Sequence, residues 1–150
     1  MNQLVSNDIN TLVIGHTNYW KQDTKLGKKT KQNFIQIPFN KLIKMLSYKC
    51  QLVGINCVIQ EESYTSKASF IDNDHIPVFN STTELNYKFS GQRVKRGLYC
   101  SKVGIKINAD INGSLNILRK YLKVNSDDLF DINSRDFRGF VYNPKVINIQ

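Results

Sequence analysis

Apolar side chains fall in short clusters that predict alternating strands and helices. Residues 11–15 form a β-branched run that stops at a glycine, which is typical of a buried strand. From Pro38 onward the apolar positions are three and four residues apart and define one face of a helix. These positions are Phe39, Leu42, Ile43, Leu46, Cys50 and Val53. Pro38 suits the first turn of this helix and Gly54 suits its end. A second β-branched run at residues 55–60 follows directly, as in an α/β unit.

The C-terminal half has a long irregular stretch before a second strand-and-helix pattern. Residues 66–97 are polar and aperiodic, so we expect a long insertion or a disordered loop there. Two short strands are predicted at residues 97–100 and 104–107, and a helix follows them. Either Asn108 or Asp110 can cap this helix, because a side-chain oxygen at its start accepts free amide hydrogens.

The charge of the chain favours a polyanionic partner. Its 150 residues contain 21 Lys and Arg against 12 Asp and Glu, which gives a formal net charge of +9, and such an excess is typical of nucleic-acid-binding proteins. Lysines interleaved with aromatic residues can follow phosphates while the rings stack on bases. The candidates in an N-terminal stretch are Tyr19, Trp20, Lys21, Lys25, Lys28, Lys29 and Lys31, and those in a later stretch are Arg93, Lys95 and Arg96. Solvated charges, and aromatic rings that anchor a loop, are the alternative interpretation.

The sequence also predicts a soluble protein in a reducing compartment. No apolar run approaches the roughly 18 residues of a membrane span, and the first ten residues lack the layout of a signal peptide. We therefore expect a cytoplasmic protein, associated with the nucleoid if its source is prokaryotic. The three cysteines are too few and too scattered for a disulfide framework. Cys50 and Cys57 lie on predicted apolar faces and are expected to be core thiols.

Acidic side chains stand at the end of one predicted strand and at the start of one predicted helix. They are Glu61 and Glu62 in the first case and Asp110 in the second. Carboxylates gathered from distant parts of a chain suit a divalent-metal nuclease, because Mg²⁺ prefers oxygen ligands and two such ions can stabilise phosphodiester hydrolysis. From the pattern alone, an exposed strand end and a plain helix cap remain the alternative.

Three local sequences add a family resemblance. They are EESYTSK at residues 61–67, YCSKVG at residues 99–104 and INADINGSLNIL at residues 107–118. Together they resemble the C-terminal part of OrfB/TnpB insertion-sequence transposases, which are RNA-guided nucleases akin to type V CRISPR effectors and Fanzor proteins. The resemblance runs from about residue 11 to residue 123. It implies an α/β fold, namely a partial RNase H-like (RuvC) domain with a degenerate zinc-ribbon-like insertion, and it implies DNA and guide RNA as partners.

The resemblance also implies site residues. Asp110 matches the last catalytic aspartate of the D-x-N-(A/G)-(A/S)-x-N-I motif, so it is the expected Mg²⁺ ligand, and Asn112 and Asn116 are expected to orient the turn. The usual V-I-E-D strand sequence is VIGH here, at residues 13–16, and lacks its glutamate. Some members resemble this chain in placing a glutamate just before the Thr-Ser pair. Glu62 is then the expected replacement, with Glu61 as the fallback.

The first catalytic aspartate of the family belongs to a G-I-D-x-G motif that nothing in the 150 residues matches. A two-metal site that lacks a bridging carboxylate loses its geometry. We therefore expect a C-terminal fragment that needs the missing N-terminal part of the nuclease and does not cleave DNA alone. The competing hypothesis is a non-catalytic nucleic-acid-binding protein that uses its basic stretches.

Zinc is not expected in the ribbon. The resemblance places the four zinc ligands of the family at Ala68, Ile71, Cys100 and Val103, of which one can bind metal. His75 could join Cys100, but two ligands do not make a closed site. The ribbon is therefore expected to be degenerate or held by packing.

The expected domain organisation follows from the resemblance. A RuvC-like segment occupies residues 1–65, the degenerate ribbon 66–107, and the last RuvC-like motif with its helix 108–123. Residues 124–150 form a tail that is expected to be weakly ordered.

Overall fold

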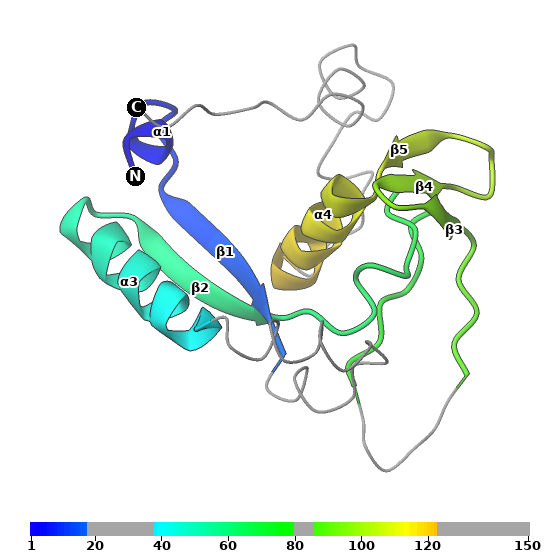
Figure 1. Ribbon diagram of the computed structural model, residues 1–150, viewed down its shortest axis with the longest axis horizontal. Coiled ribbons are helices and arrows are strands. Elements are labelled where there is room, and N and C mark those ends of the chain that lie inside the picture. Colours follow the sequence, from blue (N-terminus) through cyan, green and yellow to red (C-terminus); the bar gives the residue numbers. More distant parts are fainter. Residues whose placement is uncertain (18–37, 80–85, 123–150) are drawn as a thin grey trace. The chain divides into compact units, whose positions relative to one another are not determined.

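The computed structural model describes residues 1–17, 38–79 and 86–122 (Figure 1). Contacts divide the chain into two units, Met1–Glu61 and Glu62–Gln150. Among the described helices, none is long and apolar enough to cross a membrane. The described elements form a small mixed α/β structure that contains one parallel and one antiparallel sheet.

The first unit contains a β–α–β arrangement. The short helix α1 (Asn2–Val5) precedes β1 (Thr11–His16), and α3 (Phe39–Leu52) precedes β2 (Asn56–Glu61). The two strands pair in parallel, with Gly15 opposite Gln60 and His16 opposite Glu61. Helix α3 lies along β2 (Figure 1). The strand, the helix and the second strand that the apolar pattern predicts are thus confirmed.

Helix α3 packs on β2 through a small set of side chains. Cys50 is fully buried and Cys57 is half-buried. The Ser47 hydroxyl donates a hydrogen bond to the Cys57 sulfur at 3.4 Å. Burial, and the neighbouring Cys57, raise the pKa of the Cys50 thiol. Gly54 has a φ of +73°, a conformation that glycine adopts without strain, and it turns the chain from the helix into β2.

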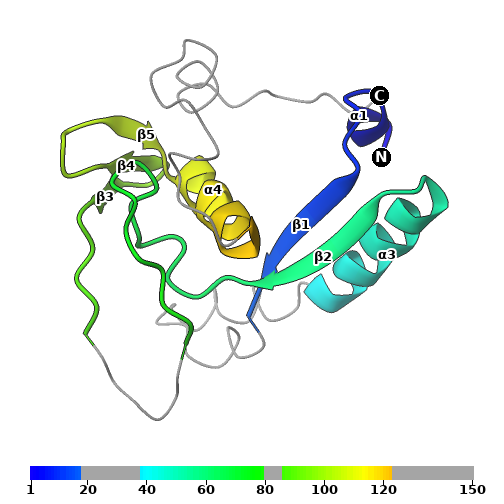
Figure 2. The same cartoon turned by 180° about the vertical axis from the view of Figure 1, so that it is seen from behind.

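The second unit combines an antiparallel sheet with one long helix. The sheet has the order β3 (Gln92–Lys95), β4 (Leu98–Cys100) and β5 (Lys106–Asn108), and α4 (Ala109–Leu122) follows directly. Seen from behind, α4 starts beside β4 and β5 (Figure 2). One apolar core joins the sheet, the helix and the preceding segment: Phe70, Tyr99, Ile107, Ala109, Ile111 and Leu115.

Two sequence-based expectations are resolved here. The expectation that residues 66–97 lack regular structure is wrong in part, because β3 forms at Gln92–Lys95 and because Ala68, Ser69 and Phe70 are fully buried. Of the two possible caps of α4, Asn108 is the one used. Its Oδ1 accepts hydrogen bonds from the backbone N–H of Asp110 at 2.8 Å and of Ile111 at 3.1 Å.

Candidate nucleic-acid interface

Two buried asparagines fasten α4 to the segment that follows β2. Asn112 accepts a hydrogen bond from the Phe70 N–H at 3.0 Å and donates one to the Ala68 carbonyl at 2.8 Å. Asn116 donates to the same Ala68 carbonyl at 2.8 Å and to the Thr65 carbonyl at 2.9 Å. Both side chains are fully buried. The asparagines of the D-x-N-x-x-x-N motif lie within α4 and bind a distant segment, whereas the resemblance led us to expect that they orient the turn.

Two carboxylates hold the turns of the second unit. Asp72 accepts a hydrogen bond from the backbone N–H of Lys102 at 2.8 Å, which ties the turn after Phe70 to the turn between β4 and β5. Asp74 accepts from the backbone N–H of Ser69 at 2.8 Å and of Ser90 at 3.0 Å, and from the Ser90 hydroxyl at 2.6 Å. Hydrogen bonds to an ionised carboxylate are among the stronger ones in proteins.

The positions that the resemblance matches to zinc ligands do not fit zinc. Ala68 is fully buried, Ile71 packs against the apolar core, and Val103 is 70% exposed. None of these three side chains carries a nitrogen, oxygen or sulfur atom, and Cys100 lies next to the Ser101 carbonyl, at 3.6 Å. The hydrogen bonds of Asp72 and Asp74 join the turns instead. No sequence pattern singled out either aspartate, because no local signal specifies the distant backbone groups that they bind.

Tyr99 and Arg119 complete the polar interior of the second unit. The Tyr99 hydroxyl donates to the Lys67 carbonyl at 2.8 Å, and burial together with the Asp74 carboxylate raises the pKa of Tyr99 to about 12. The buried Arg119 guanidinium donates to Asn73 Oδ1 at 2.7 Å and to the Asp74 carbonyl at 2.6 Å. This interior positions the segment that carries Lys67 against the sheet.

Asp110 faces a cation. Its carboxylate is 85% exposed, and Arg93 Nη2 lies 3.6 Å from its Oδ1. Arg93 projects from the fully exposed strand β3 and is itself 49% exposed. An ion pair with this much exposure contributes less than about 1 kcal/mol and exchanges readily with other partners. The structure thus brings together Asp110, which the sequence analysis assigned to a metal site, and Arg93, which it assigned to nucleic-acid binding.

The two candidate glutamates stand at the boundary between the units. Glu61 ends β2 opposite His16, and Gly15, which the resemblance matches to the family glutamate, lies opposite Gln60. Glu62 begins the second unit, and the chain after it runs along α4 toward the N-terminal end of that helix. The Thr65 carbonyl accepts a hydrogen bond from Asn116, and the Ala68 carbonyl accepts one from Asn112. Asn116 is already about 9 Å along the helix from Asp110.

A magnesium ion does not fit this arrangement as it stands. Among the described residues, no group of three or more His, Cys, Asp and Glu side chains gathers around one point. The neighbour of the Asp110 carboxylate is a guanidinium, whose charge opposes a second cation. The backbone at Glu62 lies toward the other end of α4, because Ser63 next to it accepts a hydrogen bond from Lys120 at 3.3 Å.

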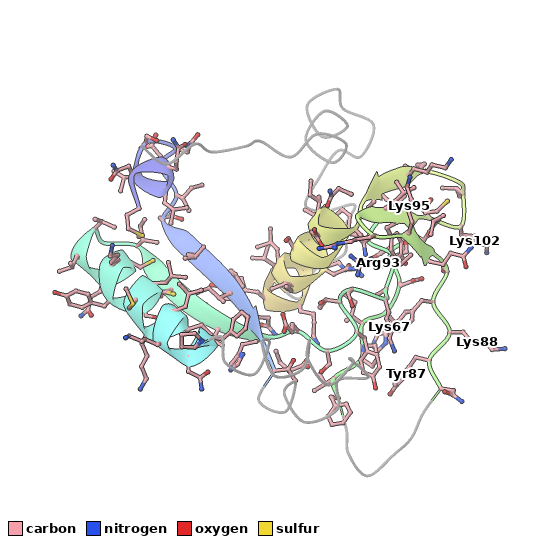
Figure 3. All side chains as sticks on the ribbon, viewed as in Figure 1. Lys67, Tyr87, Lys88, Arg93, Lys95 and Lys102 are labelled. Atoms are coloured by element: carbon pink, nitrogen blue, oxygen red, sulfur yellow. The ribbon has the colours of Figure 1, made fainter. Side chains whose placement is uncertain are left out.

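Aromatic rings and cations lie close together in the second unit. The Tyr64 ring meets the Tyr87 ring edge-on at 5.2 Å and lies 6.1 Å from the Phe89 ring, measured between centroids. The Lys67 ammonium lies 5.9 Å from the centre of the Tyr64 ring. We call this set, with the nearby cations, the cationic–aromatic surface (Figure 3). It comprises Tyr64, Lys67, Tyr87, Lys88, Phe89, Arg93, Lys95 and Lys102.

A pocket opens within this surface. Its volume is about 430 Å³, and it is lined by Ser66, Lys67, Phe89, Gly91, Gln92 and Arg93. Gly91 is needed in its wall, because a Cβ there would stand 2.7 Å from both the Cys100 carbonyl and the Tyr99 ring. The pocket therefore depends on a close approach of two backbones that only glycine permits.

Sequence reasoning found part of this surface. Arg93, Lys95 and Arg96 are exposed, as a nucleic-acid contact requires. The residues missed are Tyr64, Lys67, Tyr87 and Phe89, although the alternation of aromatic and cationic residues at positions 87–89 was an available signal. The other predicted contacts lie outside the described residues: Tyr19, Trp20, Lys21, Lys25, Lys28, Lys29 and Lys31.

The family model of the Cas12f1-like TNB domain matches residues 39–117. The match begins with the first residue of α3 and ends within α4, so it includes β2, the antiparallel strands β3, β4 and β5, and Asp110. The chain is therefore a relative of the TnpB- and Cas12-type RNA-guided nucleases. Because the match covers more than half of the chain, the chain belongs to the Cas12f1-like TNB-domain family. No curated protein and no solved structure shows a significant match.

Proposed function

We propose that this chain is the nucleic-acid-binding part of a TnpB-like, RNA-guided DNA endonuclease, and that its second unit binds a nucleic acid through the cationic–aromatic surface. DNA and guide RNA are the proposed partners. The observation that carries the proposal is that the family match coincides with rings and cations exposed together, among them Tyr87 and Arg93. Cations follow phosphates without regard to sequence, and exposed rings stack on unpaired bases.

The test is a binding titration of the 150-residue chain with labelled single-stranded DNA, single-stranded RNA and duplex DNA. Counterion release predicts that the logarithm of the association constant falls linearly with the logarithm of the salt concentration. Measurable binding with a steep negative slope supports the proposal. Binding that does not respond to salt, or no binding at low salt, would refute it.

For catalysis we propose Asp110 as the carboxylate ligand of Mg²⁺ in an intact nuclease, with Glu62 as its partner and Glu61 as the alternative. The resemblance supports this assignment. Asp110 is paired with Arg93, and Glu62 lies toward the other end of α4. The described arrangement must therefore change before the two carboxylates can share a metal ion. The chain alone is expected not to cleave DNA, because the motif of the first catalytic aspartate is absent from these residues.

Cleavage is tested by supplying the missing N-terminal part, in trans or in a reconstructed longer chain. Mg²⁺-dependent cutting that Asp110→Ala abolishes is the expected result, and unchanged cutting in that variant would exclude Asp110. Glu61→Gln and Glu62→Gln in the same chain then separate the two glutamates, and equal residual activity would contradict the choice of Glu62.

A second candidate function is nucleic-acid binding without any catalytic role. The observation that favours it is the guanidinium beside Asp110, which makes the carboxylate part of a surface ion pair rather than of a metal site. Binding that persists while every reconstructed chain fails to cut DNA would support this candidate.

A further inference from the structure

The pocket between the segment after β2 and the start of β3 combines the groups that a nucleotide needs. Its volume of about 430 Å³ falls within the roughly 300–1,000 Å³ typical of small-ligand sites. Two cations, Lys67 and Arg93, line it together with an aromatic ring, Phe89, and the polar side chains of Ser66 and Gln92. Lys67 and Arg93 come from segments that are far apart in the sequence but lie near each other (Figure 3).

We propose that this pocket binds one unpaired nucleotide of a single-stranded nucleic acid, with its phosphate between Lys67 and Arg93 and its base on the Phe89 ring. The inference rests on the proposed function and names the part of the strand that the surface recognises. The Tyr64 ring, which contacts both Phe89 and Tyr87, extends the stacking platform beyond the pocket. A base inside a duplex is stacked on both faces and cannot enter.

Arg93 gives the pocket a second property. The same guanidinium that lines it lies 3.6 Å from the Asp110 carboxylate. A phosphate in the pocket competes with Asp110 for Arg93, and the exposed pair offers little resistance to the exchange. Nucleotide binding therefore releases the carboxylate that the family resemblance assigns to Mg²⁺. Conversely, the charge of Asp110 opposes the phosphate.

The experiment uses the full chain and an octanucleotide of thymidine with 2-aminopurine at its centre, whose fluorescence is quenched by stacking. Phe89→Leu keeps an apolar side chain but removes the ring face, so it should weaken binding by about tenfold and remove the quenching. Phe89→Tyr should restore both. An RNA octamer of uridine with the same probe tests whether the sugar matters. Equal affinity for the two octamers would mean that the pocket accepts both DNA and RNA. A difference in affinity would assign the pocket to the nucleic acid that binds more tightly.

Charge variants give an independent test that does not depend on the half-buried Phe89. Arg93→Gln should weaken binding about fivefold, whereas Asp110→Asn should tighten it about twofold or more at low salt. Lys106→Gln is the matched control, because Lys106 is an exposed cation of strand β5 in the same sheet that belongs neither to the cationic–aromatic surface nor to the pocket lining. It should change the affinity by less than threefold and leave the quenching intact.

The outcomes separate the two proposals. If the wild-type chain binds no oligonucleotide, the proposed function fails. If it binds, but Phe89→Leu and Arg93→Gln behave like Lys106→Gln, the surface binds nucleic acid and the pocket does not hold a nucleotide. An Asp110→Asn variant that binds no tighter than wild type would overturn the exchange of Arg93 between carboxylate and phosphate.

Discussion

The two units of this chain are stabilised in different ways. In the first unit only Cys50 and Ile55 are buried among the described residues. Several large apolar side chains of α3, its C-terminal end and β2 are at least 44% exposed: Leu42, Met45, Tyr48, Leu52, Val53 and Ile59. The second unit has a core of six apolar residues and a buried polar set that hydrogen bonds hold in place: Thr65, Ser69, Ser101, Asn112, Asn116 and Arg119.

This difference shows what each unit depends on. Parallel sheets are normally covered on both faces, whereas the exposed apolar side chains named for the first unit lie mainly on α3, so its described residues bury little apolar surface. In the described residues of the second unit, side chains hydrogen-bond several backbone groups of distant segments. Asparagine and aspartate side chains bind peptide groups where the resemblance implies a zinc ion, and we expect this unit to be stable without metal.

The largest expected effect comes from removing an asparagine of the polar interior. Asn112→Ala leaves the buried N–H of Phe70 without its acceptor and removes one donor to Ala68. The expected loss of unfolding free energy is about 3 kcal/mol, because buried unpaired groups retain their full desolvation cost. Urea unfolding measures it. Ser114→Ala, at an exposed position of the same helix, should cost less than about 0.5 kcal/mol, and equal losses would contradict the comparison.

The next effect is a dependence on pH that arises in the second unit. The pKa of Tyr99 is raised to about 12 in the folded state, whereas it is about 10 in an unfolded chain. The folded state therefore keeps a proton that the unfolded state loses. The stabilisation is fully present below pH 10 and is lost as the pH rises to about 12, by roughly 2–3 kcal/mol.

Thermal melts of wild type and Tyr99→Phe between pH 9 and about 12 test this dependence. The variant should be less stable at neutral pH, because the Lys67 carbonyl loses its donor, but its stability should fall less steeply in the alkaline range. Parallel curves for the two proteins would show that Tyr99 is not the group that titrates.

A smaller effect is expected at the wall of the pocket. Gly91→Ala places a methyl group 2.7 Å from the Cys100 carbonyl oxygen and the Tyr99 ring, so backbone or ring must move, at a cost of about 1–3 kcal/mol. Gly113→Ala meets nothing within 4 Å inside α4 and should stabilise the protein by about 0.5–1 kcal/mol. Opposite signs for the two variants are the expected result, and a shared sign would contradict it.

The smallest effect on stability is expected at the surface pair. Arg93→Gln should change the unfolding free energy by less than about 1 kcal/mol, since Arg93 and Asp110 are both exposed. Arg93→Gln should affect nucleic-acid affinity more than it affects the unfolding free energy. A loss of stability comparable to that of Asn112→Ala would mean that Arg93 has a structural role.

The sequence was sufficient for the elements whose side chains follow a simple period. Helix α3 shows spacings of three and four, and β1 and β2 are β-branched runs. Strand β3 was missed because all four of its residues are exposed and no alternation marks it. The strands β4 and β5 were found because Tyr99 and Ile107 are their buried positions.

The site was harder to predict, because its contacts connect distant residues. Asn112 and Asn116 bind backbone groups 42 to 51 positions earlier, and no local pattern specifies which ones. The motif identified Asp110 as a candidate metal ligand, and the basic stretch identified Arg93 as a candidate nucleic-acid contact. Neither pattern predicts that the two side chains lie next to each other. The positions of Glu61 and Glu62 relative to a metal stay a prediction.

The central claim is that the second unit binds a single-stranded nucleic acid through its cationic–aromatic surface. The most direct test is the salt dependence of single-strand affinity for wild type and for a variant with Lys67→Gln and Arg93→Gln. Each lost phosphate contact should reduce the slope of log K against log salt by about 0.7, so the account predicts a slope that is less steep by about 1.4. An unchanged slope would contradict it.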